Sequence, residues 1–321
     1  ASGMIHSTQQ SDMFLTWYRT NEQILVSEEN PYQIVLTALQ VSEEFLREQG
    51  IPCQGYYSVT IQSELDDQDS GTKYGLGSSG AVTVATVEAI LLYYGYELDP
   101  LLVFKLSVLT QARLNMTGSH GDLAASSFRG LVAYYSLDKS WLSEQMSVQG
   151  LSNLLASDWK DLQIKQIGLP APLELLVGWT GSAASTTHLV SHMESKKTQQ
   201  SKEEIYSQFL NDSKVCVEQL IWACQNKDIP CIKQAVTRNR YLLRKFSEDM
   251  SLTIETPLLT ELCDSAEANG AVAKSSGAGG GDCGICLVDS QEQKEAIQII
   301  WEQAGIFPLP LTIAERNKER I

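Results

Sequence analysis

A run of glycines and serines that ends at residue 80 has the pattern that most directly indicates chemistry. It reads Lys73-Tyr-Gly-Leu-Gly-Ser-Ser-Gly80, and a long apolar stretch follows it. A glycine loop that opens a helix offers free backbone N–H groups and the positive end of the helix dipole, so it favours an anion such as phosphate. Ser78 and Ser79 can ligate Mg²⁺ through a hydroxyl, and Lys73 can reach a phosphate. The alternative is that the serines only cap the helix.

The same letters match the dinucleotide-binding fingerprint G-x-G-x-x-G. That motif requires a strand directly before its first glycine and another strand directly after the helix. Here a polar loop at residues 66–72 precedes the glycines, and Asp99-Pro100 signals a second helix after the first. The setting therefore favours a phosphate loop of another kind. A Walker A motif is absent from the sequence.

Two further segments combine glycines with a carboxylate. In Gly118-Ser-His-Gly-Asp122 the aspartate follows two glycines at a break between helices, where it can be directed at a ligand. N-capping of a helix that begins at Leu123 is the alternative, and the residues alone favour capping. The run from Lys274 to Gly284 reads Lys-Ser-Ser-Gly-Ala-Gly-Gly-Gly-Asp-Cys-Gly. So many glycines indicate a close approach of the backbone or positive φ angles, or else a flexible hairpin.

The elements that position these segments alternate irregularly between helix and strand, which predicts an α+β fold. The pattern weakens over residues 151–172, and Pro170 and Pro172 mark a domain boundary at its end, giving domains at 1–168 and 169–321. Helices are expected at 32–49, 81–94, 100–116, 123–128, 185–195, 203–225, 232–250, 257–269 and 290–304, and strands at 57–64, 131–136, 173–180, 284–289 and 307–313.

Composition limits the class of protein. The chain has 321 residues, 43% of them hydrophobic, and a formal net charge of −15. This charge argues against broad contact with nucleic acid or anionic lipid, and no apolar run is long enough to span a membrane. Seven unevenly spaced cysteines and the lack of a signal-peptide pattern after Ala1 predict a cytoplasmic protein.

Taken together and in this order, the three motifs resemble those of the GHMP-superfamily kinases, and most closely the bacterial phosphomevalonate kinases. The stretch Leu176-Val-Gly-Trp-Thr-Gly-Ser-Ala-Ala-Ser185 is similar to the strand that opens their C-terminal domain. The resemblance implies a two-domain GHMP kinase fold with an N-terminal ATP-binding domain and the active site in the interdomain cleft. It also implies ATP-dependent phosphorylation of (R)-5-phosphomevalonate to 5-diphosphomevalonate in the mevalonate route to isoprenoids.

The resemblance assigns roles to individual residues. Asp122 is the catalytic or metal-organising aspartate, Lys73 helps to neutralise the transferring charge, and Ser78 or Ser79 coordinates Mg²⁺. The phosphate loop comprises Gly75, Leu76, Gly77, Ser78, Ser79 and Gly80. The acceptor is expected to contact Ser119, Ser185, Ser275, Ser276, Gly277, Gly279, Gly280 and Gly281. The partners are then ATP and phosphomevalonate, for a monomer or homodimer.

One departure from the family keeps alternatives open. These kinases begin with a lysine motif on their first strands, and nothing before Tyr32 matches it, so we expect those N-terminal strands to be missing. The alternatives are another GHMP enzyme, such as mevalonate kinase or diphosphomevalonate decarboxylase, and a noncatalytic nucleotide-binding or metabolite-binding member.

Overall fold

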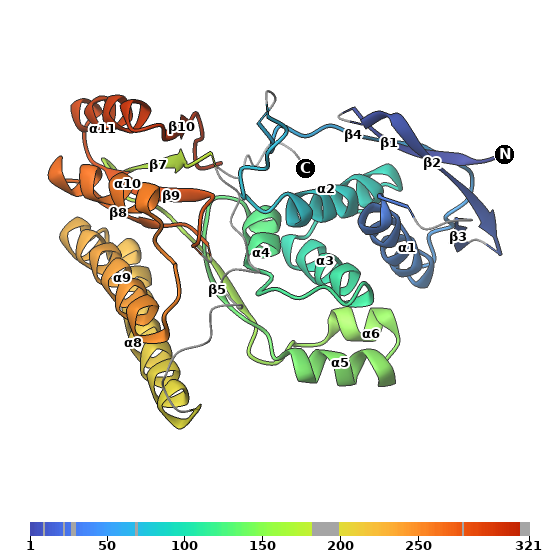
Figure 1. Ribbon diagram of the computed structural model, residues 1–321. Coiled ribbons are helices and arrows are strands. Elements are labelled where there is room, and N and C mark those ends of the chain that lie inside the picture. The colour runs from blue at the N-terminus through green and yellow to red at the C-terminus, as the bar shows by residue number, and fades with distance from the viewer. Residues whose placement is uncertain are drawn as a thin grey trace. The chain divides into compact units, whose positions relative to one another are not determined.

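The helices and strands belong to two units in the computed structural model, which describes residues 1–8, 10–21, 23–26, 30–67, 70–181, 199–277 and 279–314 (Figure 1). Of these described residues, the first unit contains those within 1–64 and 77–166 together with Ala314, and the second contains those within 65–76 and 167–313. The α+β class is confirmed, since both units combine helices with sheets. The boundary after residue 168 stays a prediction. Residues 65–76 group with the second unit, whereas the sequence pattern placed them in the first domain.

A four-stranded sheet at the N-terminus of the first unit was missed by sequence analysis. Its order is β3-β2-β1-β4, with β1 antiparallel to β2 and parallel to β4. The inner face is apolar, since Ile5, Trp17 and Ile24 are buried, but Phe14 on the outer face is 67% exposed. Apolar residues on both faces hide the alternation that identifies a strand. The strands are β1 Gly3–Ser7, β2 Gln10–Thr20, β3 Gln23–Leu25 and β4 Ser58–Ile61.

Helices make up most of the rest of the first unit. The expected helices near 32–49, 81–94, 100–116 and 123–128 and the strand near 131–136 are confirmed, whereas α5, α6 and β6 were missed. Asp99 caps α3 as expected, accepting from the Leu102 N–H at 3.0 Å. The elements are α1 Gln33–Glu48, α2 Ser78–Tyr93, α3 Pro100–Arg113, α4 Gly121–Phe128, β5 Leu131–Tyr135, α5 Lys139–Val148, α6 Leu151–Ala156 and β6 Gln163–Ile167.

The second unit is built on an antiparallel sheet of order β10-β7-β9-β8. Gly178 and Gly284 are paired in it, and a Cβ atom on either would overlap Leu262 of α10, so the glycines let α10 lie close to the sheet. The expected helix at 185–195 lies outside the described residues. The elements are β7 Glu174–Trp179, α8 Gln199–Asn226, α9 Ile229–Met250, α10 Pro257–Ala268, β8 Val272–Ser275, β9 Cys283–Val288, α11 Gln291–Gln303 and β10 Phe307–Leu309.

Within the described ranges, no helix is both long enough and apolar enough to cross a membrane.

Candidate functional site

The start of α2 exposes the backbone groups that sequence analysis assigned to phosphate binding. Gly77 is the N-cap, with a left-handed φ of 78°, and no side chain caps the helix. The first intrahelical bond runs from the Ala81 N–H to the Gly77 carbonyl at 3.0 Å, so the N–H groups of residues 78–80 precede the hydrogen-bonded part of the helix. The interpretation of Ser78 and Ser79 as mere caps is therefore wrong. Their N–H groups make no intrahelical hydrogen bond, which is the arrangement that the predicted anion site requires.

Asp122 lies directly against this helix start. A Cβ atom placed on Gly80 would overlap the Asp122 carboxyl group, and one on Gly77 would lie 3.1 Å from the Asp122 Cβ. Asp122 is in the first turn of α4, whose N-cap is His120, so the capping alternative is wrong here as well. Glycine is needed at 80 because the carboxylate occupies the space that a side chain would fill. At 77 the space is tight, and the left-handed φ of 78° favours glycine.

His120, the N-cap of α4, was missed as a site residue. It has a φ of 62° and is 6% exposed, and its Nδ1 makes no hydrogen bond with any described residue. Burial lowers the pKa of His120, and the charge of Lys139 lowers it further, while Asp122 opposes the change. The imidazole is therefore neutral near pH 7. Its place between two glycines, directly before the Gly-Asp pair, was the available sequence signal.

The segment before Asp122 is fixed by two side chains from neighbouring elements. The Tyr134 hydroxyl donates to the Ser119 carbonyl at 2.7 Å, and the Lys139 ammonium donates to the Gly118 carbonyl. The Ser119 hydroxyl accepts from the Gly121 N–H at 3.3 Å. Ser119, which is expected to contact the acceptor, lies shortly before Asp122 in the sequence and belongs to the same unit. These hydrogen bonds fix its backbone.

Lys73 belongs to a hairpin of the second unit. It forms a backbone bridge with Asp66, and the Tyr74 N–H donates to the Leu65 carbonyl at 3.1 Å. The Lys73 side chain is exposed, as the predicted role in charge neutralisation requires. Gly75 follows with a φ of 74°. The predicted phosphate loop therefore passes from the second unit to the first between Leu76 and Gly77.

The glycine run between β8 and β9 is an anchored hairpin, and its glycines have the positive φ angles that sequence analysis expected. The Gly280 N–H donates to the Ile254 carbonyl at 2.7 Å, and the Ser276 N–H donates to the Cys283 carbonyl at 2.9 Å. A Cβ atom on Gly279 would overlap Ile254, so this glycine is required.

The expected acceptor contacts differ in how accessible they are. Ser275 is only 2% exposed, whereas Ser276 is half-buried and Gly277 is exposed. Gly281 is buried and Gly280 is half-buried. Ser185 lies outside the described residues. Ser276 and Gly277 are therefore the members of this run that are best placed to meet a ligand.

Asp282, the residue after the glycine run, was also missed. A Cβ atom on Gly75 would overlap the Asp282 carboxyl group, so the two segments of the second unit touch at this point. The sequence signal was a carboxylate that immediately follows three glycines.

The donors present suit a hard cation bound together with phosphate. Among the described residues there is no cluster of three or more His, Cys, Asp or Glu that could hold a metal by itself. The Asp122 carboxylate and the hydroxyls of Ser78 and Ser79 lie at one helix start, and oxygen ligands of this type fit Mg²⁺, which usually keeps waters and takes phosphate oxygens as further ligands.

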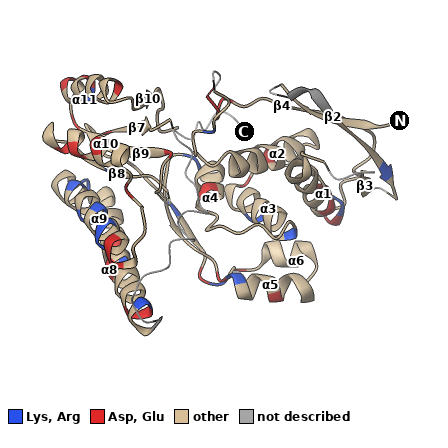
Figure 2. Cartoon of the chain, viewed as in Figure 1, with Lys and Arg blue, Asp and Glu red and all other residues tan. Residues whose placement is uncertain are grey.

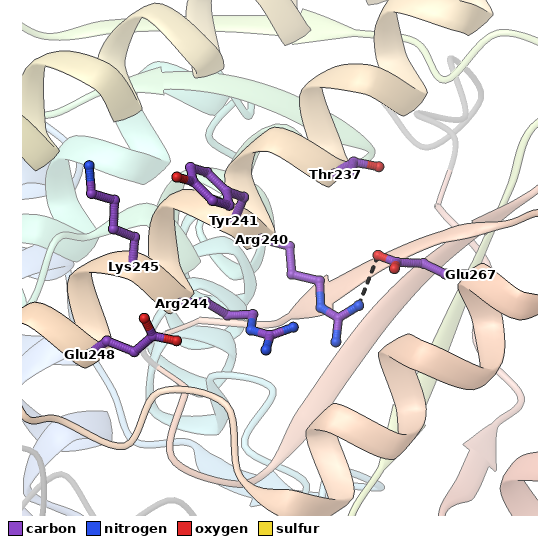
Figure 3. Close-up of a pocket in the computed structure, with 7 residues that line it drawn as sticks. All are labelled: Thr237, Arg240, Tyr241, Arg244, Lys245, Glu248 and Glu267. Atoms are coloured by element: carbon purple, nitrogen blue, oxygen red, sulfur yellow. Dashed lines mark ion pairs between the residues drawn. The ribbon is translucent and has the colours of Figure 1, made fainter.

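Two cavities of the second unit lie away from the sequence motifs. One of about 360 Å³ opens on α9, where Arg240 pairs with Glu267 at 2.9 Å (Figure 3). Another of about 320 Å³ is lined by residues of α8 and α9, including Phe209 and Phe246. Neither is lined by a residue that the sequence motifs single out.

Comparisons with known proteins agree with this geometry. The GHMP kinases N terminal domain family matches residues 34–130, and the GHMP kinases C terminal family matches residues 220–306. A phosphomevalonate kinase of Streptomyces sp. (strain CL190) is 38% identical over 282 residues, which cover 87% of this chain and 74% of that protein.

Two solved structures have the same fold over almost the whole chain. A Lin0012 protein from Listeria innocua has a TM-score of 0.88 at 32% identity and covers 98% of this chain and 86% of its own. The Streptococcus pneumoniae phosphomevalonate kinase in complex with phosphomevalonate and AMPPNP has a TM-score of 0.78 at 30% identity, covering 96% and 86%. The expected two-domain kinase fold is confirmed.

Proposed function

We propose that this chain, which belongs to the GHMP kinase family, transfers the γ-phosphate of ATP to (R)-5-phosphomevalonate and so forms 5-diphosphomevalonate in the mevalonate pathway. The observation that carries the proposal is the packing of Asp122 against Gly77 and Gly80 at the open start of α2. Support for the substrate comes from the similarity to phosphomevalonate kinases described above.

The start of α2 would hold the phosphates of ATP. The N–H groups of residues 78–80 and the helix dipole favour negative charge. Asp122 and a hydroxyl of Ser78 or Ser79 would hold Mg²⁺, which when bound supplies charge neutralisation between phosphate groups. Lys73 would add a mobile positive charge from the exposed edge of its hairpin.

The acceptor chemistry asks little of a general base. The second pKa of a phosphate monoester is about 6, so the attacking oxygen already carries charge at pH 7. Positioning and charge neutralisation then dominate the rate. Ser119, Ser185 and the 275–281 run are the proposed acceptor contacts.

The substrate assignment is tested by supplying ATP and Mg²⁺ with phosphomevalonate, mevalonate or homoserine in parallel and following ADP release and the phosphorylated product by ³¹P NMR. Turnover is expected with phosphomevalonate. Turnover of mevalonate alone would replace the substrate assignment by that of another GHMP kinase. Binding of ATP without turnover of any acceptor would indicate a noncatalytic member.

The role of Asp122 is tested by replacing it with Ala and with Asn. Both changes should lower kcat by about 100-fold or more, because oriented charge at the reacting phosphates is lost, while ATP binding stays nearly intact. Asp99→Ala is the matched control, since its carboxylate caps α3 in the same unit. The control should lose about 1 kcal/mol of stability and keep its kcat. An Asp122→Ala protein with unchanged kcat would contradict the assignment.

We also propose a cytoplasmic location and a monomeric or homodimeric state. The first is supported by the seven cysteines, all of which are free thiols. Disulfides are rare in reducing compartments.

A further inference from the structure

Asp282 lies where two glycine-rich segments of the second unit meet. A Cβ atom on Gly75 would overlap the Asp282 carboxyl group, which means that this side chain rests directly on the Gly75 backbone. Gly75 has a φ of 74°, which glycine adopts without strain. Gly75 therefore satisfies two conditions at once: the close approach of a carboxylate and a left-handed backbone.

The backbone of Asp282 is itself held in an uncommon conformation. Its φ is 52°, and Asp is among the few residue types other than glycine that enter this region readily. The Asp282 carbonyl accepts two hydrogen bonds from Thr180, one from the N–H at 2.9 Å and one from the hydroxyl at 3.0 Å. Because Thr180 is only 4% exposed, these bonds are shielded from water.

The next residue makes a second connection between the same two segments. The Cys283 thiol donates to the Tyr74 carbonyl at 3.1 Å, and the Tyr74 ring packs edge-on against Trp179 with centroids 5.0 Å apart. Residues 282 and 283 thus hold residues 74 and 75. Contacts at two successive residues fix the direction of a chain as well as its position.

The other side of Asp282 is the glycine run expected to hold the acceptor. That run is anchored by the bonds from the Gly280 N–H to Ile254 and from the Ser276 N–H to Cys283. Asp282 is its last residue before β9. Any displacement of the run therefore changes the contact between Asp282 and Gly75.

From these contacts we propose that Asp282 is a positioning residue for the kinase reaction. Its side chain holds Gly75, the first glycine of the phosphate loop, in the conformation that binds nucleotide, and it links that loop to the run at 275–281. This inference rests on the proposed function. The contact with Gly75 is one of shape, and an asparagine fills the same space.

The first experiment compares Asp282→Ala with Asp282→Asn, using Glu302→Ala as a control for loss of an exposed carboxylate on α11. Affinity for a nonhydrolysable ATP analogue is measured by calorimetry, and the KM values for ATP and phosphomevalonate and kcat by assay. Asp282→Ala should bind the analogue about tenfold more weakly, or about 1.4 kcal/mol, with a raised KM for ATP. Asp282→Asn should stay within about threefold of the unmodified protein, like the control.

Two outcomes overturn the proposal. If Asn is as damaging as Ala, the charge is what matters and the steric account is wrong. If neither change affects nucleotide affinity, Asp282 has no positioning role. A failure to phosphorylate phosphomevalonate would count against the proposed substrate only, because the nucleotide-binding comparison does not use the acceptor.

The second experiment tests the contact without any ligand. Thermal unfolding is compared for Gly75→Ala, Asp282→Gly and the double variant. The new methyl group of Gly75→Ala meets the Asp282 carboxyl group, so removing that side chain should make the double variant melt at a higher temperature than Gly75→Ala alone. Additive losses would show that the two residues do not touch. The unfolding comparison tests the contact between Asp282 and Gly75 even if Asp282→Ala does not fold.

Discussion

Glu43 in the first unit and Arg240 in the second are both deeply buried charges, but their partners differ in how far they reach into water. The Glu43 side chain is 1% exposed and accepts from Arg19 at 2.6 and 2.7 Å and from the Tyr57 and Tyr94 hydroxyls at 2.9 and 3.1 Å. Arg240 is 5% exposed and pairs with three carboxylates, two of which lie near the surface. Figure 3 shows one of these pairs, with Glu267.

The two clusters should differ in how their partners respond when Glu43 or Arg240 is removed. Arg19 is 9% exposed and its guanidinium lies over the Trp17 ring at 5.0 Å, so removing Glu43 takes the carboxylate away from a guanidinium that stays buried. Of the Arg240 partners, Glu255 is 8% exposed, but Asp264 is 56% and Glu267 is 37% exposed. The last two can turn toward water. Figure 2 shows the basic residues along α9 and the acidic residues on α10.

The Glu43 cluster also bears on the candidate site. Glu43 is on α1, Arg19 is on β2, and Tyr94 is the C-cap of α2. The cluster therefore fixes the end of α2 opposite to the glycine loop. In the second unit Arg240 joins α9 to α10 and to Glu255, which lies before α10. Both clusters connect elements, but only the first holds the helix that is expected to bind phosphate.

The largest expected effect is that of Glu43→Ala. Breaking a buried ion pair by removing one partner costs about 3–5 kcal/mol, because a buried charge is left unpaired. The change should lower the free energy of unfolding by this amount in chemical denaturation, and hydrogen exchange in residues 77–93 should rise. Glu43→Gln keeps the shape and should cost less. If Glu43→Ala lowered the free energy of unfolding by less than about 1 kcal/mol, the Glu43 cluster would not differ from the Arg240 cluster as proposed.

Arg240→Met should cost less, about 2 kcal/mol, since methionine fills part of the volume and two of the three carboxylates can be hydrated. The same denaturation measurement applies, with hydrogen exchange in residues 229–268 as the local readout. Kinetic constants for ATP should stay unchanged. A cost equal to that of Glu43→Ala would mean that the exposure of the partners does not matter.

The stability of the protein at alkaline pH should depend on the buried thiols of each unit. Burial raises the pKa of Cys53 in the first unit to about 11, and those of Cys263, Cys283 and Cys286 in the second to about 12. An unfolded thiol ionises near pH 8.5, so above that pH the folded protein holds more protons than the unfolded chain. Stability is therefore fully present below about pH 8.5 and falls as pH rises toward the folded-state values.

Each such thiol contributes up to about 1.4 kcal/mol per pH unit in this window. Denaturation between pH 8 and pH 10 should show the fall, and Cys263→Ala should flatten it. Pulse alkylation read by mass spectrometry, with each rate referenced to a free thiol, should show Cys263 opening before Cys53. A free energy of unfolding that is constant from pH 8 to pH 10 would refute the prediction.

The smallest effect is expected for Asp264→Asn. This carboxylate is 56% exposed, and an exposed ion pair contributes at most about 1 kcal/mol. The unfolding midpoint should hardly move, and added salt should reduce the difference further. A loss above 2 kcal/mol would show that Asp264 acts like the buried Glu255.

Sequence patterns predicted the parts of the fold that local chemistry determines. The Asp99-Pro100 cap and the amphipathic periodicity of α1 place those helices to within a few residues. The helix expected at 32–49 was placed one residue too early, because the Tyr32 N–H donates to the Asn30 side chain and α1 begins at Gln33. The strands β1 to β3 were missed because the sheet exposes Phe14 and Met4 on its outer face.

The candidate site was predicted in part for the same reason. The glycine loop, Asp122 and the glycine run all carry local signals that survive without knowledge of the fold. The contacts of Asp282 with Gly75 and of Asp122 with Gly80 join segments that are far apart in the sequence. Hydrophobic periodicity predicts helices and strands and cannot predict such contacts. The burial of His120 likewise depends on the packing of the folded chain. For this reason the sequence assigned no role to His120, although it lies inside the Gly118–Asp122 motif.

The assignment of residues 65–76 to the second unit has a consequence for synthesis on the ribosome. Tyr74 and Leu76 pack with Val177, Trp179 and Cys283, so the hairpin completes a cluster whose other members are made only after residues 77–166. On the nascent chain, Tyr74 and Leu76 therefore lack their packing partners while residues 77–166 are being synthesised. Contacts of such long sequence separation form late. A fragment starting at residue 167 would lack the hairpin, so the second unit should be expressed as a fusion that carries residues 65–76.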